Sequence, residues 1–268
     1  MNVEINTLDK PVSTVSWYDF AGQLTDLIPQ MHPGGEEGTR ELLEMCKIGS
    51  GSRVLDIGCG AGATACLIGR EFGSRVEGID ISEVMIARAN RRAEREGLAN
   101  SLEFRICDVR NIPFEGDSFD VIIVESVLTP LPGDKNAAML EMVRVLKPKG
   151  IVGINECIVY PDCPNELLAV LKQHPAFQGY FTPETLLELV LNSGLELVEL
   201  RQVDTQTIPE PRLDTGNLLA FLFKVYPKLL IRLIRDRDIR TARALDEKLT
   251  RMGKGYMGYA LVVAKKPG

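Results

Sequence analysis

Apolar positions in the middle of the chain alternate between short runs and helical spacing. Residues 63–72 have the spacing of a helix, and Ser82 is a suitable N-cap for another one. A further buried helical stripe runs from Met139 to Leu146 at positions i, i+3, i+4 and i+7. The short apolar runs predict five strands, at residues 53–58, 75–80, 101–107, 119–124 and 151–154. Strands alternating with helices in this way predict a parallel sheet covered on both faces.

The two ends of the chain are less regular. Residues 17–31 and 36–46 look helical on either side of His32-Pro-Gly-Gly35. Toward the C-terminus the pattern predicts a helix at residues 183–191 and strands at 195–203 and 256–264. Residues 205–255 are too many for a structureless loop in a compact domain, so we expect a helical insertion there.

These elements make up an α/β protein with three predicted parts. Residues 1–49 form an N-terminal helical cap, residues 50–204 and 256–268 form the sheet domain, and residues 205–255 form an inserted lid. The sheet domain is expected to be a Rossmann-like, doubly wound sheet of seven strands.

Composition narrows the class of protein. The chain has 268 residues, 45% of them apolar, which is enough to bury one substantial core. Its net charge of −6 argues against nucleic acid as a partner, because phosphate binding needs clustered Lys and Arg. No signal-peptide pattern or apolar span of about 20 residues is evident. The six cysteines form no CxxC pair and have no histidine at metal spacing, so we expect a cytoplasmic protein with no metal site.

The clearest chemical signal is the segment Leu55-Asp-Ile-Gly-Cys-Gly-Ala-Gly62. Glycines at alternate positions between a strand and a helix let a ligand approach the backbone. The pattern also satisfies the relaxed dinucleotide fingerprint G-x-G-x-x-A, with Asp80 at the spacing of a ribose-binding acid. A turn that serves only strand–helix packing is the structural alternative. Asp56, two residues before the first glycine, would hold a cation but repel a pyrophosphate, which favours an amino-acid-like ligand.

Further motifs follow this loop in order along residues 50–155. LDIGCGAG, GIDIS, CDVRNIPF, FDVI and LKPKG together resemble class I S-adenosylmethionine-dependent methyltransferases. The resemblance is strongest to the ubiquinone and menaquinone biosynthesis enzymes of the methyltransferase type 11 group, and it does not cover the two ends of the chain. It implies a mostly parallel sheet whose last strand is antiparallel, with S-adenosylmethionine as the cofactor.

The resemblance also implies methyl transfer to a small-molecule acceptor, for which an apolar or quinone-like compound is one candidate. A nicotinamide-dependent oxidoreductase and a non-catalytic S-adenosylmethionine-binding protein are the alternatives. A nucleic-acid base is a poor candidate, because the strand at 119–124 is not followed by an Asn-Pro-Pro-Tyr or Asp-Pro-Pro-Tyr motif.

The residues implied for the cofactor lie at the ends of the first four strands. The glycine loop would lie under the methionine part, with Asp56 at its ammonium group. Asp80 would accept hydrogen bonds from both ribose hydroxyls. The full implied set is Asp56, Gly58, Cys59, Gly60, Gly62, Asp80, Ile81, Met85, Asp108, Val109, Glu125 and Ser126.

Other members of this set have narrower expected roles. Ile81 and Met85 would line the adenine, and Asp108 would accept from its amino group beside the backbone N–H of Val109. Each has a structural alternative: Asp80 could stabilise a helix start and Asp108 a turn. Glu125, expected to face the sulfonium with Ser126, could instead pair with an arginine.

Methyl transfer from a sulfonium is an in-line displacement, so the protein mainly positions the acceptor and excludes water. A base is needed only where the acceptor must lose a proton. Location does not rank the candidates for that base, which are Tyr18, His32, Glu125, Glu156, Tyr160 and His174.

Residues 221–254 combine apolar positions with basic ones. One interpretation is an amphipathic helix that touches an anionic membrane. The other, which we favour, is a helical lid whose apolar stripe packs inward while Lys and Arg stay solvated.

Overall fold

The computed structural model describes residues 32–174, 176–204 and 237–268. Its seven strands are β1 (Arg53–Ile57), β2 (Arg75–Asp80), β3 (Leu102–Ile106), β4 (Phe119–Glu125), β5 (Leu146–Val159), β6 (Glu196–Asp204) and β7 (Met257–Lys265). The described helices are α2 (Gly35–Met45), α3 (Ala63–Phe72), α4 (Glu83–Arg95), α5 (Lys135–Val145), α6 (Asn165–Gln173), α7 (Pro183–Asn192) and α10 (Arg237–Met252).

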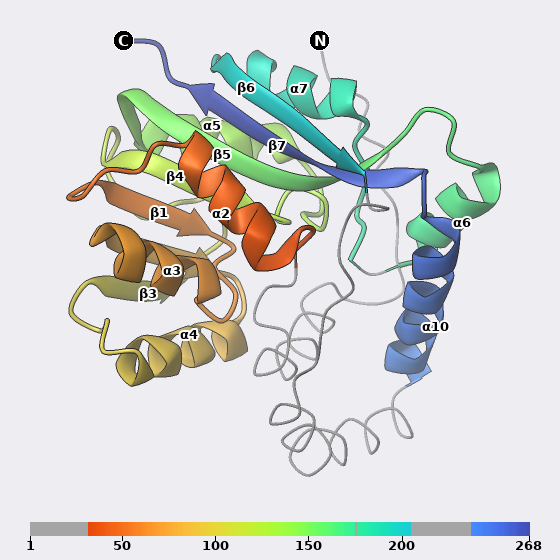
Figure 1. Ribbon diagram of the computed structural model, residues 1–268, viewed down its shortest axis with the longest axis horizontal. Helices are drawn as coiled ribbons and strands as arrows, with labels where there is room; N and C mark the ends of the chain where they lie inside the picture. Colours follow the sequence, from red (N-terminus) through yellow and green to blue (C-terminus); the bar gives the residue numbers. More distant parts are fainter. Residues whose placement is uncertain (1–31, 175, 205–236) are drawn as a thin grey trace.

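The strands form one sheet in the order β3-β2-β1-β4-β5-β7-β6 (Figure 1). Neighbours from β3 to β5 pair in parallel, whereas β7 runs antiparallel to both β5 and β6. The predicted sheet, mostly parallel with an antiparallel last strand, is confirmed. From β1 the chain continues toward one edge of the sheet through β2 and β3, and from β4 it continues toward the other edge to β5. In such sheets a crevice opens at the carboxyl ends of the two strands where the direction changes, here β1 and β4.

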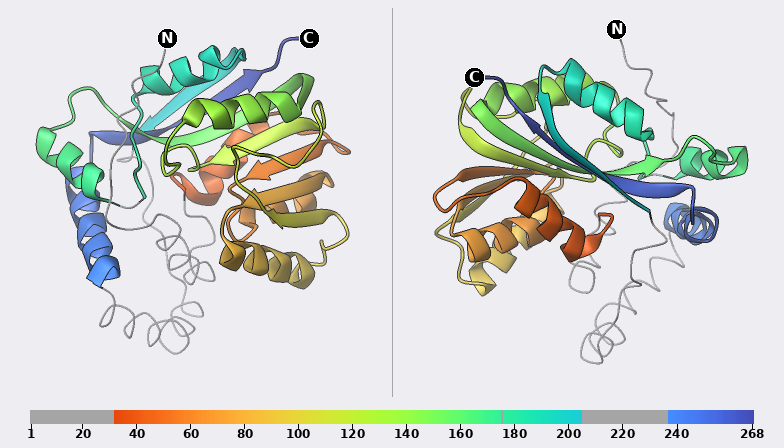
Figure 2. Two further views of the ribbon diagram at one scale, coloured as in Figure 1. Left: turned by 180° about the vertical axis from the view of Figure 1, so that it is seen from behind. Right: turned by 45° about the horizontal axis from the view of Figure 1, so that its top comes forward.

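Helices cover both faces of the sheet. Figure 2 shows α5 and α7 on one face and α2, α3 and α4 on the other. The helix starts follow from the sequence: Ser82 accepts a hydrogen bond from the N–H of Met85 at 3.2 Å, as predicted, and Asp134 caps α5. Thr182 begins α7 with a reciprocal capping box.

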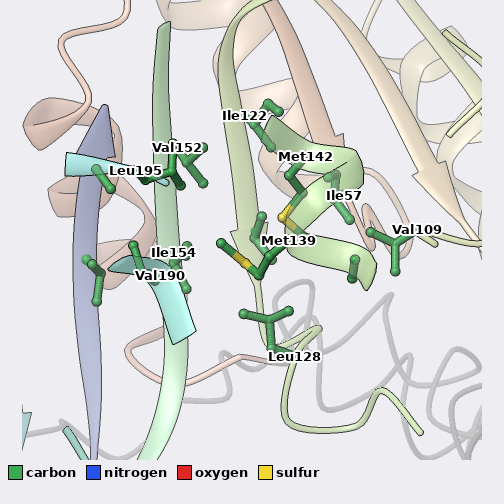
Figure 3. Packing of buried hydrophobic residues seen from close by; sticks show 14 of the residues in the cluster. Ile57, Val109, Ile122, Leu128, Met139, Met142, Val152, Ile154, Val190 and Leu195 are labelled. Carbon is green, nitrogen blue, oxygen red and sulfur yellow. The ribbon is translucent and has the colours of Figure 1, made fainter. Parts of the chain in front are cut away.

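Two apolar cores lie against the two faces. The core under α5 and α7 packs Met139 and Met142 on strand residues such as Ile122 and Ile154 (Figure 3). The core on the other face is filled from α2, α3 and α4. Burying both faces fixes the strand ends, so the loops at the carboxyl edge rest on a rigid base.

Two sequence predictions need correction, and one helix was missed. Strand β5 extends far beyond residues 151–154, because it is paired with β4 on one side and with β7 as far as Val159 on the other. For the same reason Leu146, predicted as the last position of a helical stripe, is a strand residue, and α5 ends at Val145. Helix α6 was not predicted.

The predicted helix at 17–31, which contains Tyr18, lies outside the described residues. So does most of the 205–255 insertion, although α10 is helical where the insertion is described. None of the helices in the described ranges is both long enough and apolar enough to cross a membrane.

Candidate functional site

The loop after β1 has the conformation that its three glycines predict. Gly58, Gly60 and Gly62 have φ angles of 66°, 51° and 76°, in the region that side chains disfavour. A Cβ on Gly58 would collide with Val127, and one on Gly62 would lie 3.1 Å from the ring of Phe104. Packing therefore explains these two glycines.

Gly60 is different, because a Cβ built on it meets no atom of the described residues within 4 Å. Its positive φ and the open space beside it fit a backbone that a ligand approaches closely. A turn that serves only packing does not account for this glycine. Cys59 beside it is buried, burial raises the pKa of its thiol, and its N–H donates to the carbonyl of Ile79.

Asp80, at the end of β2, connects this loop to α4. Its Oδ2 accepts the N–H of Gly60 at 2.9 Å, and its Oδ1 accepts the N–H of Ser82 at 2.8 Å. The bonds orient the carboxylate at the carboxyl edge of the sheet, beside the open space at Gly60. A carboxylate in this position suits a vicinal diol, because its two oxygens can receive two donors.

Asp56 lies beneath the loop and is almost completely buried. Its Oδ2 has no hydrogen-bond partner among the described residues. Burial raises the pKa of this carboxyl well above its usual range, and the negative charges of Glu125 and Asp80 raise it further. The floor of the crevice is therefore short of positive charge, which fits a cationic ligand group.

Glu125, at the end of β4, is buried in a polar cluster rather than paired with an arginine. Its carboxylate accepts hydrogen bonds from the hydroxyls of Thr64 at 2.8 Å and Thr39 at 3.1 Å, and from the amide of Asn155 at 3.3 Å. Nδ1 of His32 lies 3.5 Å from the same carboxylate. Four neighbours from α2, α3, β5 and the segment before α2 thus meet on one strand end.

His32 belongs to this cluster through both ring nitrogens. Nε2 lies 3.2 Å from the Thr39 hydroxyl, and Nδ1 lies 3.4 Å from the amide nitrogen of Asn155. Asn155 also donates to the carbonyl of Pro33 at 3.0 Å. The segment His32-Pro-Gly-Gly35 is therefore fastened to the ends of β4 and β5, which the sequence did not predict.

The expected adenine residues lie around the ends of β2 and β3. Asp108 is held by Arg110, with Nη2 2.6 Å from Oδ2, and this guanidinium keeps the pKa of the carboxyl below its usual range. Ile81 is 53% exposed, whereas Met85 and Val109 are buried. Ile81 is thus open to a ligand at the edge of the sheet, while Asp108 carries an ion pair that the sequence analysis did not anticipate.

Two base candidates lie in other parts of the fold. Nε2 of His174 is 2.8 Å from Asp246 of α10, and its Nδ1 accepts the N–H of Ala176 at 3.1 Å. Since Nδ1 is the acceptor, a neutral ring carries its proton on Nε2, toward Asp246. His174 therefore joins α6 to α10, which lie side by side in Figure 1.

Tyr160 follows β5, and its hydroxyl lies 2.7 Å from where a Cβ on Gly258 would be. Burial and the charge of Asp204 raise the pKa of this phenol. The Tyr160 hydroxyl therefore lies beside β7, and His174 lies between α6 and α10. Ser126, by contrast, directly follows the end of β4 at the carboxyl edge of the sheet. It has a φ of 54°, and its N–H donates a hydrogen bond to the carbonyl of Asn155 at 2.8 Å.

Comparison with known proteins places the chain in a family. The family model described as "Methyltransferase domain" matches residues 48–190, just over half of the chain. The methyltransferase GfsG of Streptomyces halstedii is 32% identical over 249 residues, which are 90% of this chain and 83% of that protein. The O-methyltransferase resE of Aspergillus sclerotiorum is 26% identical over 253 residues, with 93% and 87% covered.

Among solved structures, that of the [4+2]-cyclase SpnF matches with a TM-score of 0.76 and 24% identity, covering 98% of this chain and 99% of that one. At this identity the likeness shows the fold alone. The family match and the GfsG relative show more: the chain belongs to the class I S-adenosylmethionine-dependent methyltransferases.

This membership decides between the two cofactors that the glycine pattern allowed. The cofactor is S-adenosylmethionine, and the nicotinamide alternative is set aside. The enzyme is a methyltransferase of the kind that acts on small molecules. The matching family model is a general one and does not single out the ubiquinone and menaquinone group.

Proposed function

We propose that the crevice between the glycine loop and the end of β4 holds S-adenosylmethionine and presents its methyl group to an uncharged, largely apolar small molecule, such as a quinol. The observation that carries this proposal is the acidic floor of the crevice, above all the buried Oδ2 of Asp56, which no hydrogen-bond donor of the described residues reaches.

The described residues fit the cofactor part by part. Asp80 is oriented to receive the ribose hydroxyls, and the open space at Gly60 admits the chain that joins the ribose to the amino acid. Asp56 lies beneath, where an ammonium group would supply the missing positive charge. When bound, the cofactor supplies an electrophilic methyl group, so the protein's own task is to position the acceptor and exclude water.

The same charges restrict the acceptor. Asp56, Asp80 and Glu125 act on one another, since the last two both raise the pKa of the first. Before the cofactor's positive charges are counted, an anionic acceptor near them would be repelled by about 2 kcal/mol per ionised carboxylate, taking roughly 8 Å separation and an effective dielectric constant of about 20. This penalty disfavours acceptors that carry phosphate or carboxylate groups.

Apolar side chains near the end of β5 and the beginning of β7 favour an apolar acceptor. Phe177, Tyr180, Met252 and Tyr256 are only partly buried around the small core between α6 and α10. Oxygen is the acceptor atom that we propose, because the relative from Aspergillus sclerotiorum is named an O-methyltransferase. A phenol or quinol hydroxyl combines these properties.

The test is methyl transfer from S-adenosylmethionine labelled in its methyl group. Purified protein is incubated with matched panels of neutral quinols and phenols, phosphorylated alcohols and amines. We expect label in the neutral hydroxyl compounds, and none with the Asp80→Ala variant. Label confined to phosphorylated acceptors or amines would overturn the proposed acceptor class, and undiminished transfer by Asp80→Ala would overturn the proposed cofactor position.

A further inference from the structure

A single helical turn follows β4 at the carboxyl edge of the sheet. The N–H of Leu131 donates to the carbonyl of Val127 at 3.1 Å. Below this turn lies Glu156 of β5, whose side chain is completely buried. Its carboxylate accepts three consecutive backbone N–H groups, from Val127 at 2.7 Å, Leu128 at 2.6 Å and Thr129 at 3.1 Å.

The other end of the turn is held by a buried cation. Nζ of Lys135, a residue only 1% exposed, donates to the carbonyl of Leu131 at 2.6 Å. Burial lowers the pKa of this ammonium to about 8, and the charge of Glu156 opposes that shift. The turn thus has an anion at its N–H end and a cation at its carbonyl end, which matches the polarity of helical backbone.

This arrangement does not serve stability alone. Burial raises the pKa of Glu156, so its ionised form is less favourable in the folded protein than in water. At neutral pH a raised carboxyl pKa lowers the free energy of unfolding. Replacing buried ion pairs by apolar side chains is often neutral or stabilising. A buried carboxylate kept at this cost indicates a role in shaping the turn.

The turn lies against the glycine loop and so forms one wall of the crevice that this sheet topology predicts. Val127, its first residue, packs so closely on Gly58 that a Cβ there would collide with it. Gly58 begins the glycine loop at the end of β1, and Val127 follows the end of β4, so the contact lies where the strand order reverses. Any shift of the turn moves the wall against the loop that faces the ligand.

We propose that Glu156 and Lys135 are positioning residues for methyl transfer: they fix the turn at 127–131 and, through Val127, hold the glycine loop in its cofactor-binding shape. This rests on the cofactor position proposed above. Neither residue needs to touch the cofactor, because both act through the backbone of the turn.

The test measures binding of S-adenosylmethionine and S-adenosylhomocysteine by calorimetry, together with thermal unfolding. In Glu156→Gln the amide N–H₂ faces a backbone N–H, so part of the clamp is lost, and we expect affinity to fall by about tenfold. Val127→Ala, which leaves the clamp intact but removes the wall, should weaken binding similarly. The matched control is Asp120→Asn, whose carboxylate accepts the N–H of Arg53 at 2.9 Å at the opposite edge of the sheet. Its affinity should stay within about twofold of the original protein.

The double variant Glu156→Gln/Val127→Ala separates positioning from general destabilisation. If both residues act through one contact, the double variant binds no more weakly than the weaker single variant. Additive losses, or full affinity in a folded Glu156→Gln, would overturn the proposal. If Glu156→Gln does not fold, Val127→Ala decides, because unchanged cofactor affinity in that variant would overturn the proposal that Val127 holds the glycine loop in place. Asp80→Ala is measured alongside: its full affinity would instead overturn the cofactor position.

Discussion

Gly60 offers a direct test of whether the open space beside the glycine loop belongs to the cofactor. Alanine at this position adds one methyl group that meets no atom within 4 Å in residues 32–174, 176–204 and 237–268, so the substitution causes no collision with that part of the chain. The remaining cost is the backbone conformation, since φ is 51° and a left-handed residue with a Cβ costs roughly 1–2 kcal/mol. For a protein of this size we expect the midpoint of thermal unfolding to fall by about 2–8 °C.

Gly73 provides a matched control for that substitution. It also has a positive φ, 63°, and a Cβ on it also meets nothing within 4 Å in the part of the chain that the structure describes. Gly73 follows the end of α3, at the edge of the sheet opposite to the crevice. Gly73→Ala should therefore lower stability by a similar amount without approaching the cofactor.

Calorimetry with S-adenosylhomocysteine distinguishes the two variants. We expect Gly60→Ala to bind at least about tenfold more weakly than the original protein, because the added methyl group takes up space that the ligand needs. Gly73→Ala should bind with unchanged affinity. Equal affinities in the two variants, at similar unfolding temperatures, would refute the assignment of this space to the cofactor.

Three other substitutions test particular side chains. Asp56→Asn should remove a pH dependence of cofactor binding. Because the pKa of Asp56 is raised, the cofactor affinity of the original protein should rise with pH while this carboxyl loses its proton. Binding titrations at several pH values should show no such rise in the variant. The cofactor-free variant should also unfold at a higher temperature at neutral pH, since a neutral amide avoids the buried charge. Asp80→Ala should weaken cofactor binding by about 100-fold, because two hydrogen bonds from the ribose to a charged group are lost. It should also lower the unfolding temperature, because the N–H groups of Gly60 and Ser82 lose their acceptor. His174→Ala should lower the free energy of unfolding by about 1–3 kcal/mol, measured with denaturant, while cofactor affinity stays unchanged. A tenfold loss of affinity would instead show that His174 takes part in cofactor binding.

Much of the fold could be predicted because local patterns determine it. The glycine loop, the cap at Ser82 and the central strands are each specified by a few neighbouring residues, and the structure has them where the sequence indicates. The length of β5 could not be predicted in the same way, because it depends on pairing with β7, about a hundred residues later. Helix α6 did carry a signal, in Leu167, Val170 and Leu171 at i, i+3 and i+4, which is the face that it buries.

The places of the candidate residues in the fold were predictable to a similar extent. Acids at strand ends, such as Asp80, could be identified from their position in the alternating pattern. The partners of Glu125 could not, because Thr39 lies 86 residues away and joins it only after α2 has packed on the sheet. The role of Glu156 could not be predicted for a different reason. Its carboxylate accepts hydrogen bonds from backbone N–H groups, and no residue type in the sequence identifies these.

The central claim is that the acidic, glycine-floored crevice at the carboxyl edge of β1, β2 and β4 holds the methyl donor. A crystal structure with S-adenosylhomocysteine tests it most directly. We expect both ribose hydroxyls within hydrogen-bond distance of Asp80, the homocysteine chain across Gly60, and its ammonium group directed toward Asp56. A ligand bound at another place, or a ribose without contact to Asp80, would contradict the claim.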